Sequence, residues 1–228
     1  FVKQSTIRLA NAFSYKLKKF RQEYSKLEHV KSKPFILAIA PFDRPWFYLQ
    51  TSQAISLLLY AKRIKEDGNG GWKLVDQYYV EKDNGAEIDL GLFNNDSCSE
   101  ISAVIFSNVA TFGKAQALAI KEQQFPVLFY WLRYNEKTFG IPNIGISWGR
   151  DYDESIDDGI GIYLNPFASH PVPREFIKKF QTIHWDALKI ESAHNSLLSR
   201  MTHTINFHED ENTAQETLGK LNSIITKL

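Results

Sequence analysis

Four polar residues follow an apolar run in the segment "SEISAVIFSNVATFGK", which covers residues 99–114. They are Ser107, Asn108, Thr111 and Lys114. Hydroxyl, amide and ammonium groups between a buried strand and the start of a helix are suited to binding a phosphate. The same types of residue also serve as ordinary helix N-caps, although a cap accounts for only one or two of the four. Capping alone and ligand contact both stay open as interpretations of this segment.

A second group of polar residues is the basic cluster near the start of the chain. Residues 1–33 contain nine Lys or Arg and two Glu. A helix is predicted over residues 5–27, with an apolar stripe that consists of Phe13, Leu17, Phe20, Tyr24 and Leu27. Lys16, Lys18, Lys19 and Arg21 surround this stripe. Such a surface can follow the phosphates of DNA, which makes these four residues candidate DNA contacts. The alternative is a solvated helix face, which is the usual role of a run of charges.

An acidic cluster occupies residues 151–158. Its carboxylates belong to Asp151, Asp153, Glu154, Asp157 and Asp158. Oxygen-rich loops bind calcium or magnesium, but the spacing is not that of an EF-hand, so a solvated loop is the favoured interpretation. No acidic residue in the chain is followed two positions later by Lys, the usual magnesium-holding pattern of restriction-endonuclease-like nucleases. Phosphate-binding glycine loops and serine-hydrolase motifs are also missing from the sequence. These residues therefore support no cofactor and leave catalysis undecided.

Helix and strand patterns alternate along most of the chain. Strands are predicted at "PFILAIA", "WKLVDQYYV", "ISAVIF", "VLFYWLRY" and "IGIYLNP". Further helices are predicted in "GKAQALAIKEQQ" and in "SQAISLLLYAKR", the latter from a cap at Thr51 to about Lys65. The run "PFILAIA" has the length and continuous apolar character of a strand buried on both faces. The pattern predicts an α/β fold with a mixed central sheet flanked by helices.

The chain is predicted to divide into an α/β domain over residues 1–173 and a C-terminal extension over residues 174–228. In the extension, "MTHTINFH" is a candidate edge strand and "ENTAQETLGKLNSIITKL" predicts an amphipathic helix. The apolar seam of this helix consists of Ala214, Leu218, Leu221, Ile225 and Leu228. Because a helix this short needs a packing partner, the seam packs on its own domain, on a second copy or on another segment. We expect a monomer or a homodimer.

The bulk composition excludes several classes of protein. The net charge of +1 gives no global signal for nucleic acid or for a membrane surface. No apolar run reaches the roughly 18 residues of a membrane span. Cys98 is the single cysteine, so the chain can form no internal disulfide. A reducing compartment, and hence a cytoplasmic location, is the expectation.

Four stretches of the chain resemble a family of uncharacterised bacterial proteins. They are "YKLKKFRQEYSKLEHVKSKPFILAIAPF", "SQAISLLLYAKR", "ISAVIFSN" and "NPFASHPVP". The resemblance implies a restriction-endonuclease-like protein whose catalytic strands lie upstream of Phe1 and which uses magnesium in its full length. It adds Asn165 and His170 to the candidate ligand-binding residues. The chain departs from the family at Pro41, where relatives tend to have an acid, at Asp43, where they tend to have His, and at Ala61, where Gly is usual.

Two functions follow as expectations. The first is a part of a restriction-endonuclease-like protein that acts on or binds DNA. The second is a non-catalytic module that binds a nucleotide or a protein partner.

Overall fold

The computed structural model describes residues 2–41, 47–69, 71–123, 127–133, 143–149, 151–178, 181–183, 190–191 and 197–204, together with residues 216 and 219. The chain forms two compact units, each built from two separate segments. The first unit contains residues 1–107 and 160–192, and the second contains residues 108–159 and 193–228. The predicted boundary after residue 173 falls inside the first unit.

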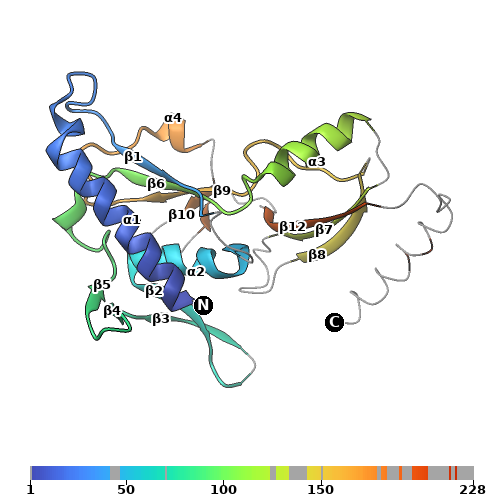
Figure 1. The fold of residues 1–228 in the computed structure, drawn as a ribbon, viewed down its shortest axis with the longest axis horizontal. Coiled ribbons are helices and arrows are strands. Elements are labelled where there is room, and N and C mark those ends of the chain that lie inside the picture. Colours follow the sequence, from blue (N-terminus) through green and yellow to red (C-terminus); the bar gives the residue numbers. More distant parts are fainter. Residues whose placement is uncertain are drawn as a thin grey trace. The chain divides into compact units, whose positions relative to one another are not determined.

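A five-stranded sheet forms the centre of the first unit (Figure 1). Its strands, in spatial order, are β1 (Ile36–Ile39), β6 (Ala103–Ser107), β9 (Ile160–Leu164), β10 (Gln181–Ile183) and β11 (Ile190–Glu191). The pairs β1–β6 and β9–β10 are parallel, whereas β6–β9 and β10–β11 are antiparallel. Together with its helices, this mixed sheet confirms the predicted α/β class.

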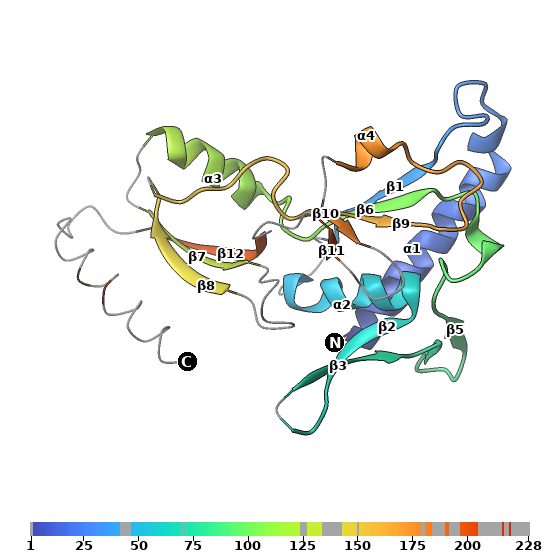
Figure 2. The ribbon, with the colours of Figure 1, turned by 180° about the vertical axis from the view of Figure 1, so that it is seen from behind.

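Alternate residues of the sheet face two different apolar layers, as the pleat of a strand requires. Leu37, Val104, Phe106 and Tyr163 belong to the main core, which they share with the helices α1 (Val2–Gln22) and α2 (Phe47–Tyr60). The two ribbon views agree that α1 lies along one face of the sheet (Figures 1 and 2). On the other face, residues such as Ala103 and Ile162 meet Val172 and the short helix α4 (Arg174–Ile177).

The first predicted helix is confirmed, but it begins three residues earlier and ends five residues earlier than the predicted range of 5–27. Phe13, Leu17 and Phe20 are buried against the core. The helix ends at Gln22 and is followed by a short 3₁₀ turn, η1 (Tyr24–Lys26), so Leu27 leaves the stripe and is 43% exposed. The sequence also predicts that the strand in "PFILAIA" is buried on both of its faces. That prediction is wrong in part: Leu37 is buried on one face, but Ala38, whose side chain leaves the other face, is exposed.

The second predicted helix begins earlier and ends earlier than its sequence suggests. It starts at Phe47, so Thr51 lies inside α2 rather than at a cap. It ends at Tyr60 because Ala61 adopts a left-handed conformation with φ of 57°, the arrangement that ends many helices. Residues expected to continue the helix instead form the strand β2 (Lys62–Glu66).

Two hairpins follow α2. β2 pairs with β3 (Trp72–Asp76), and β4 (Tyr79–Glu81) pairs with β5 (Glu87–Asp89). The strand predicted through "WKLVDQYYV" is therefore split in two. The break coincides with Gln77, whose backbone N–H donates to the carbonyl of Ala61 at 2.8 Å instead of to a strand. The short 3₁₀ helix η2 (Asp96–Cys98) then leads into β6.

The second unit contains the helix α3 (Phe112–Gln123) and a three-stranded antiparallel sheet. The spatial order of the strands is β12 (Leu197–Thr204), β7 (Val127–Arg133) and β8 (Asn143–Trp148). Val127 and Phe129 share a small core with Ala117 of α3 and with Tyr152, whose ring stacks on Phe129 at 4.2 Å between centroids. β12 lies at an edge of this sheet, which confirms an edge strand in this region, four residues earlier than "MTHTINFH" starts. The seam of the predicted C-terminal helix lies outside the described residues.

Candidate functional site

The four polar residues around the end of β6 are divided between the two units. Ser107 is the last residue of β6 and of the first segment of the first unit, whereas Asn108, Thr111 and Lys114 belong to the second unit. Ser107, Asn108 and Lys114 are buried, and Thr111 is half-buried immediately before α3. Their role as a phosphate site stays a prediction.

Lys114 has three oxygen partners inside the second unit. Its ammonium donates to the backbone carbonyls of Ser155 at 2.9 Å and of Asp158 at 2.7 Å. The same nitrogen lies 3.0 Å from a carboxylate oxygen of Glu154, which is itself buried and accepts from the hydroxyl of Tyr152. Two of the three N–H groups of the ammonium therefore have carbonyl acceptors, and the carboxylate of Glu154 lies close enough to form an ion pair with it. Contact with a phosphate would require one of these three interactions to break.

Two of the acidic residues in the segment 151–158 form contacts within the second unit. Asp158 accepts from the guanidinium of Arg133 at 2.6 Å through one oxygen and from the backbone N–H of Leu197 at 2.8 Å through the other. Glu154 and Asp158 thus have cationic partners, while Asp151, Asp153 and Asp157 are exposed. A hydrogen bond from Ser155 lowers the pKa of Asp157. Among the described residues, no group of three acidic, histidine or cysteine side chains is arranged to hold a metal ion.

Asn165 and His170 lie in the turn that follows β9. Asn165 is buried, and its amide nitrogen donates to the carbonyls of Cys98 at 3.1 Å and Ile101 at 2.8 Å. Its amide oxygen accepts from the backbone N–H of Phe167, so Asn165 ties this turn to the segment before β6. His170 is exposed, and its backbone carbonyl accepts from the hydroxyl of Ser102 at 2.6 Å. Asp43, another polar residue of the predicted family segments, lies outside the described residues.

The four basic residues of α1 have different surroundings. Arg21 donates to both carboxylate oxygens of Glu100, at 2.6 and 3.1 Å, and to the carbonyl of Ser97 at 2.8 Å. The pair of hydrogen bonds raises the pKa of Arg21 and lowers the pKa of Glu100. Lys19 lies 3.8 Å from Glu23 and above the ring of Tyr24.

Lys16 and Lys18 are exposed, as Arg21 is, but they differ from Arg21 in their partners. Within the part of the chain that the structure describes, neither side chain forms an ion pair or a hydrogen bond. The ammonium of Lys16 lies 6.0 Å from the ring of Tyr15, which is itself 63% exposed. Of the four candidate DNA contacts, these two lysines are therefore the most accessible.

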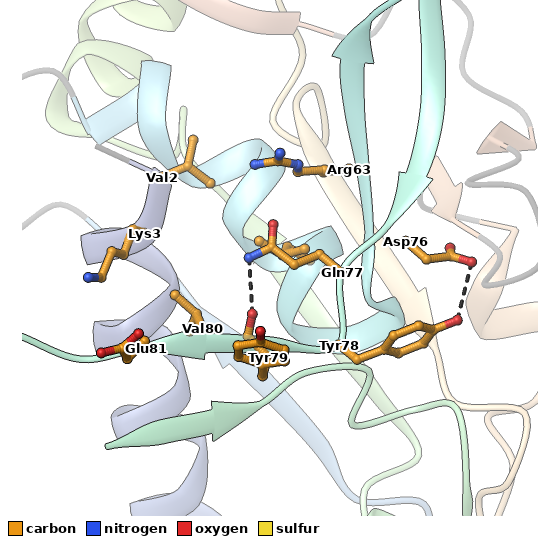
Figure 3. A pocket seen from close by; sticks show the side chains of 10 residues that line it. Val2, Lys3, Arg63, Asp76, Gln77, Tyr78, Tyr79, Val80 and Glu81 are labelled. Atoms are coloured by element: carbon orange, nitrogen blue, oxygen red, sulfur yellow. Dashed lines mark hydrogen bonds between the residues drawn. The ribbon is translucent and has the colours of Figure 1, made fainter. Parts of the chain in front are cut away.

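A hollow of about 560 Å³ opens in the first unit, and none of the residues that line it is among the site residues predicted from the sequence (Figure 3). Its lining comes from the start of α1, the end of α2, and the strands β2, β3 and β4. The polar and charged members are Lys3, Arg63, Asp76, Gln77, Tyr78, Tyr79 and Glu81. Val2, Leu57 and Val80 supply the apolar part.

Arg63 was hidden from sequence reasoning because "LLLYAKR" has the pattern of a continuing helix. The left-handed residue Ala61 ends the helix, and Arg63 then projects from the strand β2. The sequence shows only two adjacent tyrosines, Tyr78 and Tyr79, and the structure shows that they are 63% and 55% exposed.

Among the described residues, none of the helices combines the length and apolar character needed to cross a bilayer. No protein-family model matches the chain, and comparisons with curated proteins and with solved structures find no match. The family resemblance of the sequence stays a prediction.

Proposed function

We propose that this chain binds DNA through the exposed basic side of α1, as part of a restriction-endonuclease-like protein. The observation that carries the proposal is the exposure of Lys16 and Lys18 on α1 without an acidic partner among the described residues. Lys26 and Lys33, which follow the helix, are exposed as well. Lysines that carry no internal ion pair are available to neutralise phosphates and to release counterions.

Binding rather than cleavage is proposed for these residues because they hold no acid-x-Lys pattern. Magnesium would be a cofactor of the longer family protein, held by residues that this chain does not supply. The runner-up function is a non-catalytic module that binds a nucleotide or a protein partner. That module would bind its ligand through the polar residues that follow β6 and β9. Lys114 and Asn165 count against this site, because their side chains already form hydrogen bonds within the chain.

The test is DNA binding measured by fluorescence anisotropy over a series of salt concentrations. In the Lys16→Gln/Lys18→Gln variant, we expect weaker binding and a log–log salt slope that is shallower by about 0.9 for each phosphate that the variant no longer neutralises. The matched control is Lys65→Gln/Lys73→Gln, which removes two exposed, directly paired lysines from the β2–β3 hairpin. This control should keep the parent slope.

Two results would contradict the proposal. An unchanged slope in the Lys16→Gln/Lys18→Gln variant would mean that this side of α1 faces solvent and does not contact DNA. An equal loss in both variants would show that only the total charge matters.

A further inference from the structure

The lining of the hollow includes Arg63, whose Nε atom has no hydrogen-bond partner among the described residues. We propose that this hollow is a mononucleotide site, in which Arg63 binds the phosphate and Tyr79 contacts the base. The proposal does not depend on DNA binding by α1, because it uses none of the lysines proposed to contact DNA.

The guanidinium of Arg63 carries the argument. Its Nε atom is buried and has no hydrogen-bond partner among the described residues. A buried donor without a partner costs free energy, and a bound anion would remove that cost. The fork of N–H groups on arginine matches the oxygens of a phosphate better than a lysine ammonium does.

The nearest acid on the paired strand is already occupied. Asp76, which also lines the hollow, accepts from the ammonium of Lys62 at 2.6 Å and from the hydroxyl of Tyr78 at 3.3 Å. The hydrogen bond from Lys62 lowers the pKa of Asp76. Lys62 and Arg63 are successive residues of β2, so their side chains leave opposite faces of the strand. In Figure 3, Glu81 lies beside Lys3 and away from Arg63.

The rest of the hollow suits the sugar and the base. The exposed ring of Tyr79 offers a flat face for stacking. The amide nitrogen of Gln77 donates to the carbonyl of Tyr79 at 3.0 Å, and its amide oxygen points toward the side of Arg63 in Figure 3. That oxygen can accept from a hydroxyl or an amino group of a ligand.

The walls of the hollow are held in place by contacts that involve neither Arg63 nor Tyr79. Lys3 and Gln4 at the start of α1 both contact the carboxylate of Asp83 in the β4–β5 turn, at 3.4 and 3.3 Å. Leu57 and Val80 are buried beneath the polar rim, with 2% and 5% exposure. The volume of about 560 Å³ lies in the range of small-molecule sites.

The experiment is calorimetric titration of the whole chain with each of the four 5′-mononucleotides, the matching nucleosides and inorganic phosphate. We expect at least one mononucleotide to bind at a single saturable site. Its nucleoside, and inorganic phosphate alone, should each bind at least about tenfold more weakly. Arg63→Gln should weaken the mononucleotide about tenfold or more. Tyr79→Ala should weaken it about fivefold or more, because the base would have no ring on which to stack.

The matched control is Lys65→Gln, which removes an exposed cation from the same strand without touching the hollow. This variant, and Lys16→Gln/Lys18→Gln, should bind the mononucleotide like the parent chain. If Arg63→Gln fails to fold by circular dichroism, Arg63→Lys keeps the charge, removes the fork and should still weaken binding.

Several outcomes would overturn the proposal. One is the absence of saturable binding by all four mononucleotides. Another is equal binding by the parent chain and the folded Arg63 variant, or an equal loss in Lys65→Gln. Inorganic phosphate that binds as tightly as the mononucleotide would show that the ring contributes nothing. Loss of DNA binding in the α1 variant with mononucleotide binding intact would support both proposals at once.

Discussion

At the scale of single residues, Lys114 and Arg133 each place a cation inside the second unit, and each meets an acid from residues 151–158. Lys114 pairs with Glu154 at 3.0 Å, and Arg133 pairs with Asp158 at 2.6 Å. Buried pairs of this kind add little net stability when both partners are present, but removal of one partner leaves the other charge unpaired. The acidic cluster is thus explained in part by the cations that it satisfies.

We expect Lys114→Met to lower the free energy of unfolding by about 3–5 kcal/mol, because the buried carboxylate of Glu154 would lose its cation. The measurement is urea unfolding followed by circular dichroism. The control is Lys114→Met/Glu154→Gln, which removes the stranded charge and should recover part of the loss. A cost below about 1 kcal/mol would mean that solvent screens this pair as it screens surface pairs.

At the scale of elements, α1 is attached to the rest of the first unit by its apolar stripe, by the contacts of Lys3 and Gln4 with Asp83 at its start, and by a polar clamp near its end. The clamp joins Arg21 near the end of the helix to Glu100 and to the carbonyl of Ser97. It fixes the end of the helix beside the segment that leads into β6. Arg21 therefore differs from Lys16 and Lys18: it holds the helix, and they face solvent.

We expect Arg21→Gln to lower the free energy of unfolding by at most about 1 kcal/mol at neutral pH, since the pair is partly exposed. The hydrogen bond from Arg21 lowers the pKa of Glu100 in the folded chain. The stabilisation is thus complete above the ordinary glutamate pKa of about 4.3 and is lost as the pH falls through the lowered folded value.

The measurement compares the melting temperatures of the two chains from about pH 7 down to about pH 3, where their difference should shrink. The second measurement is the log–log slope of DNA binding against salt concentration, which should be unchanged in Arg21→Gln. A difference in melting temperature that grows toward acid would contradict the assignment of Glu100 as the titrating partner.

At the scale of the whole molecule, the chain contains a mixed five-stranded sheet in one unit and a three-stranded antiparallel sheet in the other. Each unit is completed by residues from a distant part of the sequence. The first unit recruits residues 160–192, and the second recruits residues 193–228. Neither unit is a continuous segment that could be cut out along the sequence.

We expect the chain to show no magnesium-dependent cleavage of plasmid DNA, because it holds no acid-x-Lys pattern. The assay is agarose-gel analysis of supercoiled plasmid with magnesium or with EDTA. Asp151→Asn and Asp157→Asn are the informative variants, since both carboxylates are exposed and are not needed for the buried ion pairs. Robust cleavage that disappears in one of them would place an active site in the acidic loop.

The sequence by itself determined the elements whose signal is local. The stripe of Phe13, Leu17 and Phe20 predicted α1, and the apolar run from Ile101 to Phe106 predicted β6. Both signals arise from the periodicity of side chains along one element, which requires no knowledge of neighbours. The α/β class followed from the alternation of such elements.

Only the tertiary structure decided which polar residues are available to a ligand. Lys114 and Arg21 have the same residue types as phosphate and DNA contacts, but their partners lie 40 and 79 positions away, at Glu154 and Glu100. The hollow around Arg63 likewise depends on a left-handed Ala61 that turns an expected helix into a strand. Pairing and backbone reversal are set by contacts between distant segments, and no local pattern in the sequence records them.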